Sequence, residues 1–569
     1  MCVSALNEDI WKISNYIVFL KAGIKQHTDT LVRMSRTVSG WILKSAKQSV
    51  NVIHREKCHY SKCLLTQQQV KWRSPSKSKA VFQKWLCYPV HEINFSGERS
   101  FRQISSENDV QFLLSPSQIN YILRANELSY KPVEFNGKNP STVFKFESNQ
   151  LASNTPCEDR RSAATCLQTN GHFFGVFDGH AGSACAQSVG ERLFYYIAVS
   201  LMSQKTLEDI EFASEHMKPM LPIFQWHKHK DDHLYREGAS LYIDHLRVYW
   251  QELINLDNKT GMSVDDAMVY AFQRLDSDIS LEAQVPTDNE FLRNLTLQVA
   301  FSGATACVSH VDGVHLHIAN AGDCRAILGV QNDSGAWSAV PLTADHNAFN
   351  KAELQRLHAE HPPSEKDTIV TDNRLLGILM PFRAFGDVLF KWSRELQKSV
   401  LQNACDLEPL NIYQYSPSNY HTPPYLSAEP EVTYHKLRPQ DKFLIMASDG
   451  LWDMLESEQV VKLVANHLSE NSLQEPKVSA QKRSLGKMYN LLLKRQSRKI
   501  PVPDQNIATH LIRHAIGSNE DGEIEQEKLA TMLSLSEDLA RMYRDDITVT
   551  VVFFNSSAIE SYYKENTNS

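Results

Sequence analysis

The stretch FFGVFDGHAG, residues 173–182, places an aspartate at the end of a run of aromatic and apolar residues. Such a run, bounded by Gly and Asp, predicts a buried strand over Phe173–Phe177 that ends at Asp178. A carboxylate held rigidly at a sheet edge needs a partner or ligates a cation. From Gly179 onward the sequence changes to helical periodicity up to Met202, so the Asp178 loop is predicted to join a strand to a long helix.

Two further aspartates lie at the ends of predicted strands. KFLIMASDGLWD places Asp449 after the predicted strand Phe443–Ser448, and RMYRDDITVTVVFF places Asp545 just before the predicted strand Ile547–Phe554. Three carboxylates on separate rigid strands could converge on hard ions such as Mg²⁺ or Mn²⁺, and paired divalent ions suit phosphate ester hydrolysis. For each aspartate taken alone, the alternative is an ordinary turn, because Asp-Gly is a common turn dipeptide.

Composition limits the classes of protein. The chain has 569 residues, 42% of them hydrophobic, which is enough for a large core. Its ten cysteines are scattered and form no CxxC pair, so the sequence favours a reducing compartment over a disulfide framework or a zinc ribbon. The sequence has no run of about 18 uncharged apolar residues, and the best candidate, Tyr16–Leu20, ends at Lys21, so no transmembrane segment is expected.

The N-terminal part is basic. Between residues 34 and 91 there are eleven Lys or Arg and one acidic residue, Glu56. This acid-poor, Ser-rich and amphipathic composition predicts a mitochondrial presequence over 34–104, and thus the mitochondrial matrix. A nucleic-acid-binding tail and a disordered charged linker are the alternatives. Residues 1–33 contain acidic residues, so we interpret them as an N-terminal extension and Met34 as an alternative start site.

The remainder alternates between helix and strand patterns. A helical lead-in over 105–145 contains a predicted helix, Ile119–Leu128, preceded by a cap-like Ser115. Ser263 and Asp266 form a capping-box pattern ahead of a helix over 263–279. Strands are predicted at 305–311, 314–320 and 325–329, and a helix at 460–468. The pattern favours an α+β fold with helices packed outside β-sheets.

Three segments stand apart from this pattern. Two polar stretches near 388–425 and 469–535 are predicted to be insertions, either solvated loops or docking surfaces, and 557–569 a C-terminal tail.

Five motifs in order give a family resemblance. They are VFDGHAG, ANAGDCRAILG, FRAFGD, ASDGLWD and YRDDITV. Over residues 146–556 this series resembles the PPM family of metal-dependent protein serine/threonine phosphatases. The resemblance implies an α/β/β/α sandwich of two antiparallel sheets flanked by helices.

The resemblance also implies roles for individual residues. Asp178 would bridge two Mg²⁺ or Mn²⁺ ions, the Gly179 carbonyl would ligate one, and Asp449 and Asp545 would complete the other. Asp323 in AGDCR is a candidate ligand for a weaker third ion, and Asp387 in FGD is at least as compatible with a structural role.

His180 is the implied general acid that protonates the leaving oxygen of serine or threonine, a task that suits a side chain with a pKa near 6.5. Glu158 and Asp159 match the acidic pair that orients water around the ions. Their alternative is a helix start or a surface salt bridge with Arg160 and Arg161.

The chain departs from the family at one position. Many PPM phosphatases have an arginine four residues before the glutamate of the acidic pair, where it binds the substrate phosphate. Here the residue is Asn154, whose amide offers no charged bidentate contact. Phosphate binding is therefore expected to depend on the metals, with Asn154, Arg160 and Arg161 as candidate contacts.

Within the family, the resemblance is narrower still. Five segments look like the catalytic subunits of pyruvate dehydrogenase phosphatases: 192–201, 244–253, 272–282, 301–307 and 374–392. The basic segment looks more like that of the second isoform than the first. The implied substrate is phosphoserine on the dehydrogenase component of the pyruvate dehydrogenase complex. The implied partners are the lipoyl-bearing acetyltransferase core and a regulatory subunit.

Other functions remain as alternatives. They are a catalytically silent phosphoprotein-binding relative, a PPM phosphatase with another mitochondrial substrate, and a two-metal hydrolase such as a nuclease. No nucleic-acid partner is expected, because the chain outside the presequence is not basic.

Overall fold

The computed structural model describes residues 114–132, 141–169, 171–230, 232, 238–256, 259–402, 419–474 and 504–567, all within one compact unit, Gln111–Ser569. The expected extension (1–33) and presequence (34–104) lie outside the described residues. Within the described ranges, no helix combines the length and apolar character that a bilayer crossing requires.

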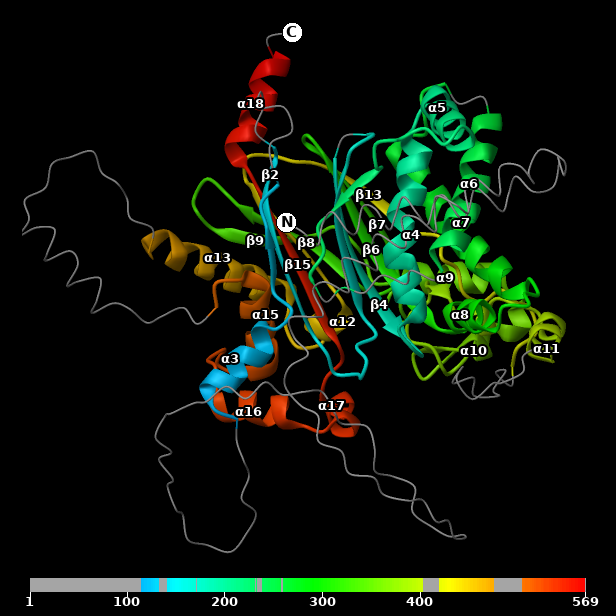
Figure 1. The fold of residues 1–569 in the computed structure, drawn as a ribbon. Coiled ribbons are helices and arrows are strands. Elements are labelled where there is room, and N and C mark those ends of the chain that lie inside the picture. The colour runs from blue at the N-terminus through cyan, green and yellow to red at the C-terminus, as the bar shows by residue number, and fades with distance from the viewer. Residues whose placement is uncertain are drawn as a thin grey trace, which may run out of the picture. The chain divides into compact units, whose positions relative to one another are not determined.

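Two antiparallel sheets lie in the middle of this unit (Figure 1). The first sheet has the order β1-β2-β15-β14-β8-β9, with strands at Leu128–Tyr130, Val143–Leu151, Ile547–Phe554, Asp441–Ala447, Arg325–Gln331 and Trp337–Pro341. The second has the order β13-β7-β6-β4-β3-β5, with strands at Glu431–Lys436, His315–Ala321, Gly303–Asp312, His172–His180, Arg160–Cys166 and Phe224–Trp226. A short strand, β12 (Phe385–Gly386), also pairs with β6.

The alternation of side chains along the strands builds three cores. In β14, Leu444 and Met446 belong to the core between the sheets, whereas Phe443 and Ile445 face the helices outside the first sheet. The second sheet is covered by α4 (Ala184–Leu201), α6 (Ala239–Asn255), α7 (Val264–Gln284) and α8 (Glu290–Phe301). The first sheet is covered by α3 (Pro116–Arg124), α13 (Ser457–Gln474), α15 (Ile507–Gly517) and α16 (Gln526–Ser534). The predicted α/β/β/α sandwich is confirmed (Figure 1).

Several local predictions are confirmed at the level of single residues. Ser263 caps α7 by accepting from the backbone N–H of Asp266, and β15 spans the predicted Ile547–Phe554. The helix predicted at 119–128 instead ends at Arg124, because Leu128 pairs with Ser148 of β2 in the first sheet.

The segments expected to be solvated insertions contain core structure. Within 469–535, the helix α15 has Ile507, Leu511 and Ile516 fully buried against the first sheet, so the loop prediction is wrong for this part. The apolar residues of α15 recur with helical spacing, but the helix was not predicted because the sequence on both sides of it is polar. The stretch 475–503 lies outside the described residues.

The other two segments need the same correction. Within 388–425, η3 (Val388–Phe390) and α11 (Arg394–Gln402) precede the buried Tyr420 and Tyr425, which pack in a small separate core. The same core includes residues near α9 (Lys351–Glu360), α10 (Lys366–Ile369) and the hairpin β10–β11 (Val370–Thr371, Arg374–Leu375). The predicted C-terminal tail forms α18 (Ser556–Thr567), with Ile559 buried in the core between the sheets.

Candidate active site

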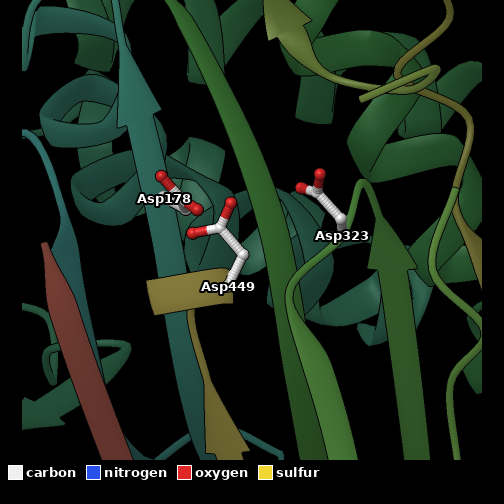
Figure 2. Close-up of side chains that lie close together, drawn as sticks. All are labelled: Asp178, Asp323 and Asp449. Atoms are coloured by element: carbon white, nitrogen blue, oxygen red, sulfur yellow. The ribbon is translucent and has the colours of Figure 1, made fainter. Parts of the chain in front are cut away.

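Three aspartates from separate elements converge where the two sheets meet. Asp178 lies near the end of β4, Asp323 in the loop from β7 to β8, and Asp449 at the start of α12 (Asp449–Trp452) directly after β14. One carboxylate oxygen from each lies within 4.8 Å of the others. Figure 2 shows Asp178 and Asp449 close to each other, with Asp323 opposite them. The second sheet supplies Asp178, the first sheet positions Asp449, and the loop joining them supplies Asp323.

Asp545 and Gly179 complete the set of expected metal ligands. Asp545 is exposed and lies between α17 (Glu537–Tyr543) and β15. It is near enough to Asp178 and Asp449 that its charge raises the pKa of both. A Cβ at Gly179 would overlap the backbone carbonyl of Glu158, so only glycine fits here. The three carboxylates whose oxygens lie within 4.8 Å of one another are those of Asp178, Asp323 and Asp449, so Asp323 takes the position in this cluster that was expected for Asp545.

The electrostatics of these carboxylates fit a divalent cation. Burial, followed by the charges of Asp449, Asp159 and Asp323, raises the pKa of Asp178 well above its usual value. Burial and the charge of Asp323 do the same for Asp449. Oδ1 of Asp449 and Oδ1 of Asp159 are buried with no hydrogen-bond partner among the described residues. Clustered buried carboxylates must bind protons or a cation, and an all-oxygen donor set suits Mg²⁺ or Mn²⁺.

The acidic pair Glu158 and Asp159 borders this cluster. Asp159 is 1% exposed, and its Oδ2 accepts from the Ser448 hydroxyl at 2.8 Å. Burial and then Asp546 raise the pKa of Asp159 to about 7. The backbone N–H of Gly182 donates to Glu158 Oε1 at 2.7 Å, and Arg541 lies 3.5 Å from Oε2.

The two arginines after this pair are bound by the protein itself. The Arg160 guanidinium donates to the carbonyls of Cys157 and Asp159 and to the side chain of Gln187. The Arg161 guanidinium donates to the Ser148 hydroxyl and the Asn126 carbonyl. Neither arginine forms the salt bridge with Glu158 that was the alternative for this segment; in the described part of the chain the ionic partner of Glu158 is Arg541.

Asp546 organises the loop that carries Asn154 and Glu158, and sequence reasoning missed it. Its carboxylate accepts from the backbone N–H groups of Ser153, Asn154 (2.8 Å) and Glu158 (2.7 Å), and from the Asn154 side-chain amide at 3.1 Å. It is 2% exposed. The only signal in the sequence was the second aspartate of YRDD. Asn154 is thus tied to Asp546.

Arg544 is a second residue that the sequence did not single out. It is 9% exposed, and its Nε and Nη1 have no hydrogen-bond partner within the described ranges. Burial lowers its pKa, and the charge of Asp546 opposes that shift. The Ser153 hydroxyl donates to its carbonyl at 2.8 Å, so Arg544 lies beside the loop of Asn154.

His180 is hydrogen-bonded to an aspartate distant in the sequence. Its Nε2 lies 2.6 Å from Oδ2 of Asp387, which belongs to the FGD motif. Burial lowers the pKa of His180, but the charge and hydrogen bond of Asp387 outweigh burial, and the net shift is upward. The ring therefore holds a proton more readily near neutral pH, as a general acid requires.

Comparisons with known proteins identify the family of the chain. The family model described as Protein phosphatase 2C matches residues 204–491. The chain is 57% identical to human pyruvate dehydrogenase (acetyl-transferring) phosphatase 2, mitochondrial, over 93% of this chain and 100% of that protein. It is 58% identical to human pyruvate dehydrogenase (acetyl-transferring) phosphatase 1, mitochondrial, over 80% of this chain and 86% of that protein. The protein of the latter name from Saccharomyces cerevisiae is 26% identical over 82% of this chain and 78% of its own length.

Proposed function

The chain belongs to the protein phosphatase 2C family, and we propose that it hydrolyses phosphoserine at the acidic centre of Asp178, Asp449 and Asp545 with two divalent ions, Mg²⁺ or Mn²⁺. The observation that carries this proposal is the convergence of Asp178, Asp323 and Asp449 from separate elements. The chain is a protein serine/threonine phosphatase of the mitochondrial matrix. Its substrate is phosphoserine on the pyruvate dehydrogenase component, whose complex it reactivates. The second-isoform resemblance is confirmed, because the match covers the whole of the human second isoform.

The roles of the residues follow from their positions. Asp178 and the Gly179 carbonyl would hold the ions together with Asp449 and Asp545, and Asp323 would ligate a weaker third ion. When bound, two such ions lower the pKa of water to make a nucleophile and offset the charge of the phosphate. Glu158 and Asp159 accept hydrogen bonds from water in the site. His180 gives a proton to the leaving seryl oxygen.

Phosphate recognition in this proposal depends on the ions more than on side-chain cations. Arg160 and Arg161 remain candidates from the sequence, but both donate hydrogen bonds to acceptors within the protein. Asn154 contributes at most an uncharged amide, one N–H of which already donates to Asp546. Binding energy must therefore come from contacts distant from the phosphate, for which the lipoyl-bearing acetyltransferase core and a regulatory subunit are the proposed partners.

One assay separates this function from its alternatives. Inorganic phosphate is measured with the full chain, a phosphoserine peptide from the dehydrogenase component and the intact phosphorylated complex, each with Mg²⁺ or with EDTA. Metal-dependent release is expected from both substrates. Binding without release would identify a silent phosphoprotein-binding protein. Release from neither substrate, together with cleavage of DNA or RNA, would identify a nuclease.

The docking argument predicts a difference between substrates. The kcat/KM on the intact complex should exceed that on the excised peptide by about one to two orders of magnitude or more, because docking raises the local substrate concentration. Asn154→Arg should narrow this gap by improving peptide binding, provided that its guanidinium, which offers charged donors, reaches the phosphate. Asn154→Gln, which adds length without charge, is the matched control. Equal kcat/KM values for wild type on both substrates would refute the docking argument.

A further inference from the structure

The pair of His180 and Asp387 is built by residues 207 positions apart. The imidazole Nε2 and the Asp387 Oδ2 are 2.6 Å apart. The His180 side chain is 24% exposed and the Asp387 side chain 5% exposed. The carboxylate is therefore enclosed while part of the ring reaches solvent. Asp387 therefore contacts the ring from its enclosed side.

The strands around the pair leave room for it. His180 of β4 is the register partner of Gly303 in β6, and Gly303 is in turn the partner of Gly386 in β12. A Cβ at Gly303 would overlap both His180 Nε2 and Asp387 Oδ2. The hydrogen bond therefore forms across the space that a glycine leaves open between two strands.

The backbone at Asp387 is held in an uncommon conformation. Its φ is +48°, in the left-handed region that non-glycine residues seldom adopt. Its N–H donates to the Ser302 carbonyl at 3.0 Å, and its own carbonyl accepts from Phe390 at 2.9 Å. On the adjoining helix, Asp276 accepts from Gly386 N–H at 2.9 Å and from the Lys391 ammonium at 2.7 Å. Several elements thus fix one carboxylate against one nitrogen of the ring.

We propose that Asp387 is a positioning residue that fixes His180 so that Nδ1, and not Nε2, delivers the proton to the leaving oxygen. The proposal rests on the proposed phosphoserine hydrolysis. An imidazole has two nitrogens, and Asp387 occupies Nε2. The Nε2–H bond is retained throughout. As the phosphorus–oxygen bond breaks, the Nδ1–H bond breaks and an O–H bond forms on the serine, which leaves the ring neutral and the serine protonated.

The test compares two aspartates that hold the same turn. Asp387→Asn keeps shape, and asparagine tolerates the left-handed region, so the fold should persist. Its kcat on a phosphoserine peptide should fall by about 10- to 100-fold, part of what a general acid supplies, with little loss on an aryl phosphate. Asp276→Asn is the matched control, since the Asp276 carboxylate accepts from Gly386 and Lys391 and not from His180. Its effect should be similar for both substrates.

A double-mutant cycle decides whether Asp387 acts through His180. His180→Gln with Asp387→Asn should lose about as much kcat on phosphoserine as His180→Gln alone. The proposal would be overturned if the loss of kcat in the double variant equalled the product of the losses in the two single variants. It would also be overturned if Asp387→Asn lost equal activity on both substrates. If His180→Gln itself affects both substrates equally while metal-dependent release persists, the general-acid role fails. If the wild type releases no phosphate at all, the proposed function fails.

A measurement on the wild type tests the tautomer without relying on a variant of Asp387. In ¹⁵N spectra of histidine-labelled full chain, the His180 signals are assigned as those missing from His180→Gln. At alkaline pH, where the ring is neutral, the proton should reside on Nε2. A neutral ring protonated on Nδ1 would overturn the proposal.

Discussion

Asp449→Asn and Asp545→Asn should each reduce metal-dependent phosphate release by about 10³-fold or more, while the fold is retained. Each change removes one anionic ligand oxygen and leaves the side-chain shape almost unaltered. The measurement is kcat on the phosphorylated complex over a range of Mg²⁺ concentrations up to saturation. Normal turnover of either variant at saturating Mg²⁺ would refute its assignment as a metal ligand.

The stability of the metal-free Asp449→Asn variant is the control for folding. Burial, then Asp323 and Asp545, raises the pKa of Asp449 well above 3.8 in the folded chain. The folded state therefore holds this proton more tightly than the unfolded state does. As pH rises above 3.8, Asp449 ionises in the unfolded chain before it ionises in the folded chain, so the wild type loses stability. Asp449→Asn has no carboxyl group at this position and does not lose this contribution. Without metal at neutral pH, the variant should unfold at a higher temperature than wild type. If Asp449→Asn is unfolded, its inactivity does not test the metal site. Asp545→Asn, a change at an exposed position, then provides the decisive comparison.

His180→Gln should lower kcat on phosphoserine by about 10²- to 10⁴-fold, the usual contribution of a general acid. The alkoxide of serine is a poor leaving group and needs a proton as it departs. The phenolate of an aryl phosphate leaves without that help, so the same variant should lose much less activity on an aryl substrate. The measurement is kcat for both substrates at one fixed Mg²⁺ concentration.

The comparison between substrates also controls for damage to the metal centre. A change in metal binding would lower both activities alike, because both reactions need the same ions. Equal losses on phosphoserine and on the aryl phosphate would make His180 a structural residue or a part of the metal site.

The strand-end aspartates could be found from the sequence because their signals are local. Asp178, Asp449 and Asp545 each adjoin a run of buried apolar residues, and the strand after Asp545 has the predicted bounds. The cap at Ser263 involves neighbours three residues apart, and its first half forms as predicted, because the Ser263 hydroxyl accepts from the Asp266 N–H. The Asp266 carboxylate accepts from the Ser263 hydroxyl, and not from the Ser263 backbone N–H as in a full capping box. Their convergence, however, depends on sheet order, which came from the family resemblance and not from the periodicity.

The supporting contacts could not be read from the sequence because they join distant segments through short elements. Asp387 follows a strand of two residues, too short for any periodic pattern, and only the fold brings it to His180. Asp546 acts through backbone N–H groups almost 400 positions away, which no side-chain pattern reveals. The buried helix α15 was obscured because polar residues dominate the surrounding sequence.

The central claim, a pair of divalent ions held mainly by Asp178, is tested most directly by electron paramagnetic resonance of the full chain loaded with Mn²⁺. Two ions about 3.5–4 Å apart on a shared carboxylate are magnetically coupled. At two equivalents of Mn²⁺, wild type should give the spectrum of a coupled pair, Asp178→Asn should lose it, and Asp323→Asn should keep it. Two uncoupled ions in wild type, or a coupled pair that survives Asp178→Asn, would contradict the account.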